Sequence, residues 1–217
     1  STLNKITLDG SGKTISLIDQ LNMNGDLVIN ANDTLTLNGV NFSFGNGSDQ
    51  ITVNGVLDID EGANLEVSNT GTVLVNSGGR LNLVGLSTNP AQMSGSGSYA
   101  LEVKGTMAAK YYNIQNINQQ GVYINGGTID LTNNFSYGTF SNGQANGKFL
   151  QIQGNNQNLT GANKIVEVEF PTDPGGTSYN VYVTNSSSGS YNFDDASGFF
   201  NGSAYEYDPD GVVDWTY

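Results

Sequence analysis

The chain has 217 residues, of which 36% are hydrophobic and 12% charged, and its net charge at pH 7 is −13. With only 7 Lys and Arg, it lacks the clustered positive charge that binds nucleic acid or anionic membranes. It contains no Cys or His, which excludes thiol chemistry, Ser-His-Asp triads and most transition-metal sites. No apolar run reaches the roughly 20 residues that span a bilayer.

Residues 1–24 contain two aliphatic-polar-aliphatic triplets, at 6–8 and 15–17, separated by a Gly-rich turn. This alternation has the period of a strand with one buried face. We expect the segment to form an irregular first coil that caps the N-terminal end. No signal peptide is recognisable, so we also expect residue 1 to be a mature start.

From residue 27 to residue 124, a triplet of this kind recurs every 21 to 28 residues. Each triplet opens a unit of three predicted strands, and the first strands lie at 27–29, 51–53, 73–75, 101–103 and 122–124. Second strands are predicted at 35–37, 57–59, 81–83, 107–109 and 129–131. Third strands are predicted at 42–44, 65–67, around Met93, 112–114 and 135–137. Internal periods of about 20 to 50 residues are typical of solenoids.

One such coil cannot bury its own apolar face, so the coils are expected to stack about 4.8 Å apart with strand pairing on strand. Stacking would place one residue of each coil in a common interior column, namely Leu27, Ile51, Val73, Leu101 and Val122. The Asn that follows most first strands predicts a ladder of side-chain amides, which Lys104 interrupts.

After residue 140 the step lengthens, with candidate strands at 150–152, 166–168 and 181–183. We therefore assign residues 25–189 to a solenoid body of about seven or eight coils. Residues 190–217 are assigned to a C-terminal capping segment in which Trp215 packs over the last coil, because a solenoid must cover the unpaired backbone at its ends. The three parts form a single structural domain.

The three-strand repeat resembles the right-handed parallel β-helix of the pectate-lyase-like superfamily. Residues 122–129 (VYINGGTI) and 208–215 (DPDGVVDW) are also similar to stretches of large exported proteins of bacteria. The resemblance covers about residues 25–185 and implies an all-β, right-handed parallel β-helix in a secreted or surface protein. One fold hosts many activities, so the activity must be argued from individual residues.

Four carboxylates are the sharpest catalytic candidates: Asp58, Asp60, Glu61 and Glu66. Asp58 and Asp60 are two residues apart in a predicted strand, on one face and about 7 Å apart, a spacing that suits glycosidases. Outward positions of a solenoid are polar in any case, and the neighbouring slots form no acidic cluster. We therefore assign no catalytic residue.

A lyase of this fold would, by resemblance, also need a basic residue and a Ca²⁺ cradle. Arg80, which we place in a solvated turn, Lys104 and Lys110 are not set against an acidic cluster. Asp194 and Asp195 form a further carboxylate pair without the pattern of a full Ca²⁺ loop.

No cofactor is expected to be required, and a structural Ca²⁺ is the alternative. Its candidate ligands are the turn aspartates Asp208 and Asp210 and, less favoured, Asp58 and Asp60.

Three tyrosines are candidates for stacking on sugar rings. Tyr123 and Tyr182 have the outward parity of the first strand, in the same column as Val28 and Leu74, and Tyr111 lies nearby. The outward Val28 and Leu74 indicate that this face meets a partner or another copy of the chain.

The repeat and the composition favour a non-enzymatic structural or adhesive module that is secreted or exposed on the cell surface. A stalk, a subunit of a matrix or filament, and an adhesin segment are the three versions of this hypothesis. Its partners would be a second copy, end to end or laterally, or a cell-surface glycan. Carbohydrate binding through surface aromatics is the alternative function, followed by a polysaccharide lyase or hydrolase.

Overall fold

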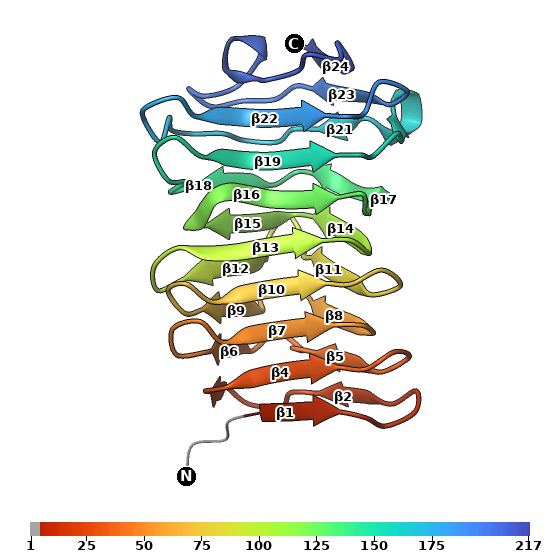
Figure 1. Ribbon diagram of the computed structural model, residues 1–217, viewed down its shortest axis with the longest axis vertical. Coiled ribbons are helices and arrows are strands. Elements are labelled where there is room, and N and C mark those ends of the chain that lie inside the picture. The colour runs from red at the N-terminus through yellow and green to blue at the C-terminus, as the bar shows by residue number, and fades with distance from the viewer. Residues whose placement is uncertain (1–4) are drawn as a thin grey trace.

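The chain forms a rod of stacked coils, with β1 at one end and β24 at the other (Figure 1). The computed structural model describes residues 5–217. It is an all-β parallel solenoid with three strands per coil, which confirms the predicted fold class, and it has about nine turns rather than seven or eight.

Three parallel sheets form the walls of the rod, and each of the first six coils contributes one strand to each wall. Sheet A contains β1 (Lys5–Leu8), β4 (Asp26–Ile29), β7 (Gln50–Val53), β10 (Thr72–Val75), β13 (Tyr99–Val103), β16 (Ile117–Asn125), β19 (Lys148–Gln153) and β22 (Tyr179–Thr184). Sheet B contains β2 (Thr14–Ser16), β5 (Thr34–Thr36), β8 (Val56–Ile59), β11 (Arg80–Val84), β14 (Thr106–Lys110) and β17 (Thr128–Ser136). Sheet C contains β3 (Leu21–Met23), β6 (Asn41–Phe44), β9 (Asn64–Val67), β12 (Ala91–Gly95), β15 (Tyr112–Gln115) and β18 (Thr139–Ser141).

A fourth, smaller sheet completes the C-terminal end. It contains β20 (Asn158–Leu159), β21 (Ile165–Val166), β23 (Ser190–Asp194) and β24 (Val213–Thr216). The described helices are two short 3₁₀ turns, η1 (Gly161–Asn163) and η2 (Ser203–Tyr205). Within residues 5–217, no helix is long and apolar enough to cross a membrane.

The interior column predicted from the triplets is confirmed and extends farther than expected. Parallel pairing aligns, in chain order, Leu27, Ile51, Val73, Leu101, Val122, Leu150 and Val181. Each of these side chains is at most 2% exposed. Full burial of a large aliphatic side chain contributes about 1.5–3 kcal/mol, so the columns are the main source of stability.

Aromatic side chains are concentrated in the core of the later coils, where they pack beside the aliphatic columns. In the later coils Phe140 stacks on Phe170, with ring centroids 5.5 Å apart, and both lie near Phe149. Trp215 stacks on Phe193 at 4.6 Å and closes this cluster from the last strand. The capping segment therefore does contain the expected Trp packing, and it also continues the parallel sheet through β23 and β24.

The first coil pairs with the second in all three sheets. Asp33 fastens the turn between β1 and β2 to the next coil, because its carboxylate accepts the backbone N–H groups of Gly10 (2.8 Å), Gly12 (2.9 Å) and Lys13 (3.0 Å). These bonds, that of Gly10 first, lower the pKa of Asp33. The predicted Gly-rich turn at 9–12 is thus held by a buried acceptor from the neighbouring coil.

The predicted amide ladder is confirmed at one step. Asn76 Nδ2 donates to Asn54 Oδ1 at 2.8 Å. Lys104 breaks the series, as expected, and lies 3.3 Å from a carboxylate oxygen of Glu102. The amide of Asn125 then donates to the same Glu102 at 2.7 Å instead of to another amide.

Two late strand predictions are wrong. Phe135 and Ser136 end the sheet B strand β17, and Tyr137, with φ of 60°, forms the corner that follows; the third strand of that coil is β18, where Phe140 pairs with Ile114. Both segments carry a Phe beside a Ser, so the alternation alone could not show which of them belongs to the third wall. The predicted strand at 166–168 is also interrupted, because Val166 ends β21 and Glu167, with φ of 52°, forms a corner.

We predict that Ile51→Ala, which opens a cavity in the column, lowers the free energy of unfolding by about 2–5 kcal/mol. The measurement is urea denaturation followed by circular dichroism. Thr52→Ala, on the outward side of the same strand, is the matched control and should change stability by about 0.5 kcal/mol or less. Equal losses in both variants would contradict the assigned inward and outward faces.

Candidate functional site

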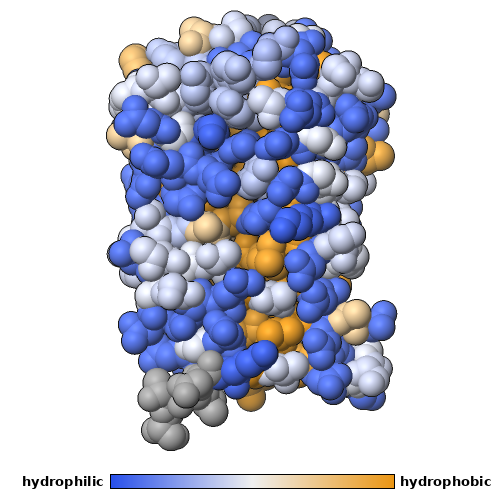
Figure 2. Space-filling model, in the orientation of Figure 1, coloured by the Kyte–Doolittle hydropathy of each residue, from blue (hydrophilic) through white to orange (hydrophobic). Residues whose placement is uncertain are grey.

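Sheet A presents a single outward row of side chains across the coils. In chain order the row is Thr7, Val28, Thr52, Leu74, Glu102, Tyr123, Gln151, Tyr182 and Tyr207. The predicted column of Val28, Leu74, Tyr123 and Tyr182 is therefore confirmed. The apolar members lie on the face where Figure 2 shows a hydrophobic stripe along the rod.

Both faces of the Tyr182 ring are covered by neighbouring coils. The Tyr207 ring stacks on it with centroids 4.5 Å apart and an interplanar angle of 12°. Lys148 Nζ, from the preceding coil, lies 4.5 Å from the Tyr182 ring centroid. Partial burial raises the pKa of Tyr182 and lowers that of Lys148, because it disfavours the charged form of each side chain. A sugar ring has no free face of Tyr182 on which to stack.

Tyr123 is half-buried and its hydroxyl donates to Gln153 Oε1 at 2.6 Å. Burial, assisted by the charge of Glu102, raises the pKa of Tyr123. Between Tyr123 and Tyr182 lies Gln151, which is 7% exposed and whose Oε1 has no partner among the described residues. The two predicted tyrosines are thus separated by one coil rather than forming a continuous platform.

Tyr111 lies elsewhere, at the corner where the chain passes from sheet B to sheet C. Four successive coils turn this corner with one residue at positive φ: Tyr111 (50°), Tyr137 (60°), Glu167 (52°) and Asp195 (52°). The amides of Tyr137 and Glu167 donate to Val166 O (2.8 Å) and Asp194 O (2.9 Å) of the following coil. These four residues, which we call the B–C corner column, therefore lie one above another.

Positive φ at these residues is unfavourable, because only Gly and, less readily, Asn and Asp adopt it at low cost. Holding a bulky residue there costs of order 1–3 kcal/mol, and the cost persists only where the surrounding structure fixes it. The paired backbone supplies that constraint for Tyr111 and Tyr137. The positive φ makes each ring project from the edge between sheets B and C.

The two rings stack on each other, with centroids 4.9 Å apart and an interplanar angle of 22°. Lys110 Nζ lies 5.7 Å from the centroid of Tyr111 and 5.5 Å from that of Tyr137. Both rings are only half-buried, and both line an open groove of about 510 Å³, which we call the corner groove. It is lined by Ser87, Tyr111, Tyr137, Gly138, Thr139, Glu167, Glu169, Asp195 and Ser197.

The polar wall of the corner groove combines carboxylates with hydroxyls. Thr139 Oγ1 donates to Glu169 Oε2 at 3.1 Å, which fixes one carboxylate against sheet C. Glu167 and Asp195 are exposed, and their carboxylates form no hydrogen bond with another residue within 5–217. None of the lining side chains is basic, so every formal charge in the lining itself is negative, while Lys110 lies beside the rings and Lys164 is paired with Asp194.

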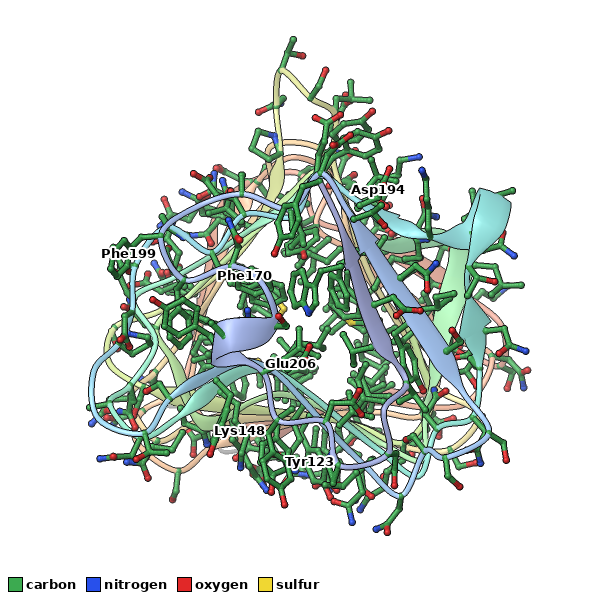
Figure 3. All side chains as sticks on the ribbon, turned by 90° about the horizontal axis from the view of Figure 1, so that it is seen from above. Tyr123, Lys148, Phe170, Asp194, Phe199 and Glu206 are labelled. Atoms are coloured by element: carbon green, nitrogen blue, oxygen red, sulfur yellow. The ribbon has the colours of Figure 1, made fainter. Side chains whose placement is uncertain are left out.

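Figure 3 shows that the two aromatic regions are on different sides of the rod. Tyr123 and Lys148 lie along one side of the triangular outline, whereas Asp194, which precedes the corner residue Asp195, lies near the opposite vertex. At that vertex the loop between β11 and β12, which contains Ser87, protrudes beyond the walls (Figure 3). The three predicted tyrosines therefore do not form one site.

The carboxylates considered for catalysis are dispersed. Asp58 faces outward on sheet B and accepts from Asn82 Nδ2 at 3.2 Å. Asp60 follows the strand and accepts the amide of Gly39 at 2.8 Å, and Glu66 accepts from Ser43 Oγ at 3.0 Å on sheet C. Each therefore links one coil to the next rather than facing a common substrate.

The description of Arg80 as a solvated turn residue is wrong. Arg80 begins β11, donates to Asn82 Oδ1 at 2.6 Å and forms an ion pair of 2.8 Å with Asp130. Burial alone would raise the pKa of Asp130, but this pairing and two backbone amides lower it overall. Arg80 is thus part of a polar ladder on the outside of sheet B.

The two turn aspartates proposed for Ca²⁺ each accept a backbone amide. Asp208 Oδ2 accepts the N–H of Val213 at 2.8 Å, and Asp210 Oδ2 accepts that of Ser186 at 2.9 Å. Within residues 5–217, no group of three or more acidic side chains is arranged to hold a metal ion. The calcium prediction stays a prediction.

Sequence reasoning identified Tyr111 but missed the rest of the corner groove. Tyr137 and Glu167 were placed in strands, where their side chains would have pointed to different surfaces. The usable signal was the tyrosine directly after each of the last two sheet B strands, namely Tyr111 after Lys110 and Tyr137 after Ser136. Compared with protein families, with curated proteins and with solved structures, the chain gives no match.

We predict that millimolar Ca²⁺ leaves the melting temperature unchanged, because Asp208 and Asp210 are each engaged by a separate backbone amide. Differential scanning fluorimetry of the wild type with Ca²⁺ and with a chelator provides the measurement. Asp210→Asn is the control variant. A Ca²⁺-dependent rise in melting temperature that disappears in this variant would instead establish the calcium site.

Proposed function

We propose that the chain is a non-enzymatic structural or adhesive module of a secreted or cell-surface protein. The observation that carries the proposal is the uninterrupted stacking of coils, in which strands and side-chain columns pass from β1 to β24. A solenoid of this kind is a stiff spacer whose outer walls are available for contact along their whole length. The resemblance to bacterial exported β-helices supports the location outside the cell.

The hydrogen-bond partners of the carboxylates support a non-catalytic role. Asp58 and Glu66 bind side chains of neighbouring coils on different walls, and Asp60 binds a backbone amide. Paired-carboxylate hydrolysis requires two such groups facing one scissile bond. In this chain they instead stabilise the stacking of coils.

We predict that the purified protein attaches to the surface or extracellular matrix of cells, or assembles into filaments, without degrading polysaccharide. Fluorescence microscopy and electron microscopy test attachment and assembly. Assays for product release from acidic and neutral polysaccharides, with and without Ca²⁺, test degradation. Strictly isolated rods with no surface attachment would contradict the structural or adhesive role, and released oligosaccharides would contradict the non-enzymatic one.

Carbohydrate binding through surface tyrosines is the second candidate function. It is favoured by the half-buried Tyr111, Tyr123 and Tyr137, since a Tyr ring offers an apolar face and a polar hydroxyl to an amphipathic ligand. Two of these rings line a groove of about 510 Å³, within the size range of ligand pockets.

For this candidate we predict that at least one polysaccharide retards the wild-type protein in native affinity gels. Retardation should be weakened by removing the tyrosine ring that contacts the sugar, because the ring provides the apolar contact; Tyr123→Ala tests sheet A and a tyrosine variant of the corner groove tests that groove. Unchanged migration in every polysaccharide tested would remove the candidate.

A further inference from the structure

We propose that the corner groove is a binding site for a polysaccharide chain that carries no acidic groups. The Tyr111–Tyr137 stack provides the apolar contact, and Glu169 and Thr139 provide the polar one. This inference rests on the second candidate function and specifies where the sugar binds and of which class it is.

The aromatic wall is the first argument. Tyr111 and Tyr137 are held at positive φ, a backbone conformation that is unfavourable for tyrosine. Strained residues persist where the surrounding structure fixes them, and they cluster at ligand sites. The strain at these two consecutive coils brings two rings together at the wall of a groove.

The polar wall is the second argument. A sugar presents hydroxyl groups around an apolar ring face, so its site needs an aromatic surface beside hydrogen-bond acceptors and donors. Glu167 and Asp195 offer exposed carboxylate oxygens, the hydroxyls of Ser87 and Ser197 offer both donors and acceptors, and Thr139, which donates to Glu169, offers an acceptor. The groove therefore contains both components side by side.

The charge of the residues that line the groove determines which class of sugar can bind. Three carboxylates and no basic side chain line the groove, so a uronate or a sulfated sugar would meet repulsion at close range. Lys110 contacts the two rings but is not among the lining residues. A chain without acidic groups avoids this repulsion.

The length of the site favours a polymer over a single sugar. Its lining residues come from five successive coils, beginning with Ser87 in the β11–β12 loop and ending with Ser197 after β23. Four steps of about 4.8 Å each give a groove on the order of 19 Å long, parallel to the rod axis. Several consecutive sugar rings can therefore contact it at once.

The row on sheet A is a weaker site for the same ligand. Tyr182 lies between Tyr207 and Lys148, and Tyr123 uses its hydroxyl on Gln153. Tyr123 remains the best ring on that wall and therefore provides the matched control for the corner groove.

The test variant is Tyr137→Gly, which removes the ring and also relieves the positive φ. Because glycine is favoured at this φ, loss of binding cannot be ascribed to a backbone that fails to form. Tyr137→Phe keeps the ring, Glu169→Gln keeps the size of the side chain but removes its charge, and Tyr123→Ala removes a ring from the other wall. Circular dichroism and melting temperature verify that all four are folded.

Binding is measured by affinity gels and calorimetry with neutral glucan, mannan and xylan, an amino-sugar polymer, and polyuronate and sulfated polymers. We expect at least one polymer without acidic groups to bind the wild type. Its affinity should fall about tenfold or more in Tyr137→Gly and stay within about threefold in Tyr137→Phe and Tyr123→Ala. Glu169→Gln should weaken binding of that polymer without creating a preference for acidic ones.

Three outcomes would overturn the inference. If Tyr123→Ala abolishes binding while Tyr137→Gly retains it, carbohydrate binding stands but its location is wrong. Preference for a polyuronate or sulfated polymer would show that the assigned class is wrong. If no polymer binds the wild type, both the second candidate function and this site fail.

Discussion

Parallel, in-register hydrogen bonding between successive coils is the constraint on which the rest of the structure depends. It forces equivalent residues of each coil to lie one above another, whether they point inward, as Ile51 and Val73 do, or outward, as Tyr123 does. Inward columns bury apolar surface that no single coil could bury alone. Outward columns turn a sequence repeat into rows of side chains along the rod, and any function of the chain is built from such rows.

The corners between the walls are subject to the same constraint, but the residue type at the corner differs from coil to coil. A one-residue turn needs positive φ, and the chain meets this need with Tyr111 and Tyr137 in two coils and with Glu167 and Asp195 in the next two. Coil pairing compensates for the unfavourable conformation, because each corner amide donates to the following coil. The corner groove is therefore a product of coil stacking and not of a separate folded element.

The sequence was sufficient to predict the fold, the three walls and the interior columns, because period-2 triplets separated by turn residues repeat at similar intervals. It was insufficient in the later coils, where Phe135 and Phe140 both fit the pattern of a third strand, although Phe135 ends the sheet B strand β17 and only Phe140 lies in sheet C. The site depended on that distinction. Tyr137 and Glu167 become neighbours of Tyr111 only when the chain is turned at the right residue, which side-chain alternation does not specify.

The concentration of aromatic side chains in the later coils has a consequence for spectroscopy. The single tryptophan, Trp215, lies on Phe193 at the C-terminal end, and Phe140, Phe149 and Phe170 lie near the same end. Intrinsic tryptophan fluorescence therefore reports on the last coils alone, whereas far-ultraviolet dichroism samples strands throughout the rod. Comparing the two signals during denaturation distinguishes melting of one end from cooperative collapse of the whole solenoid, without any introduced label.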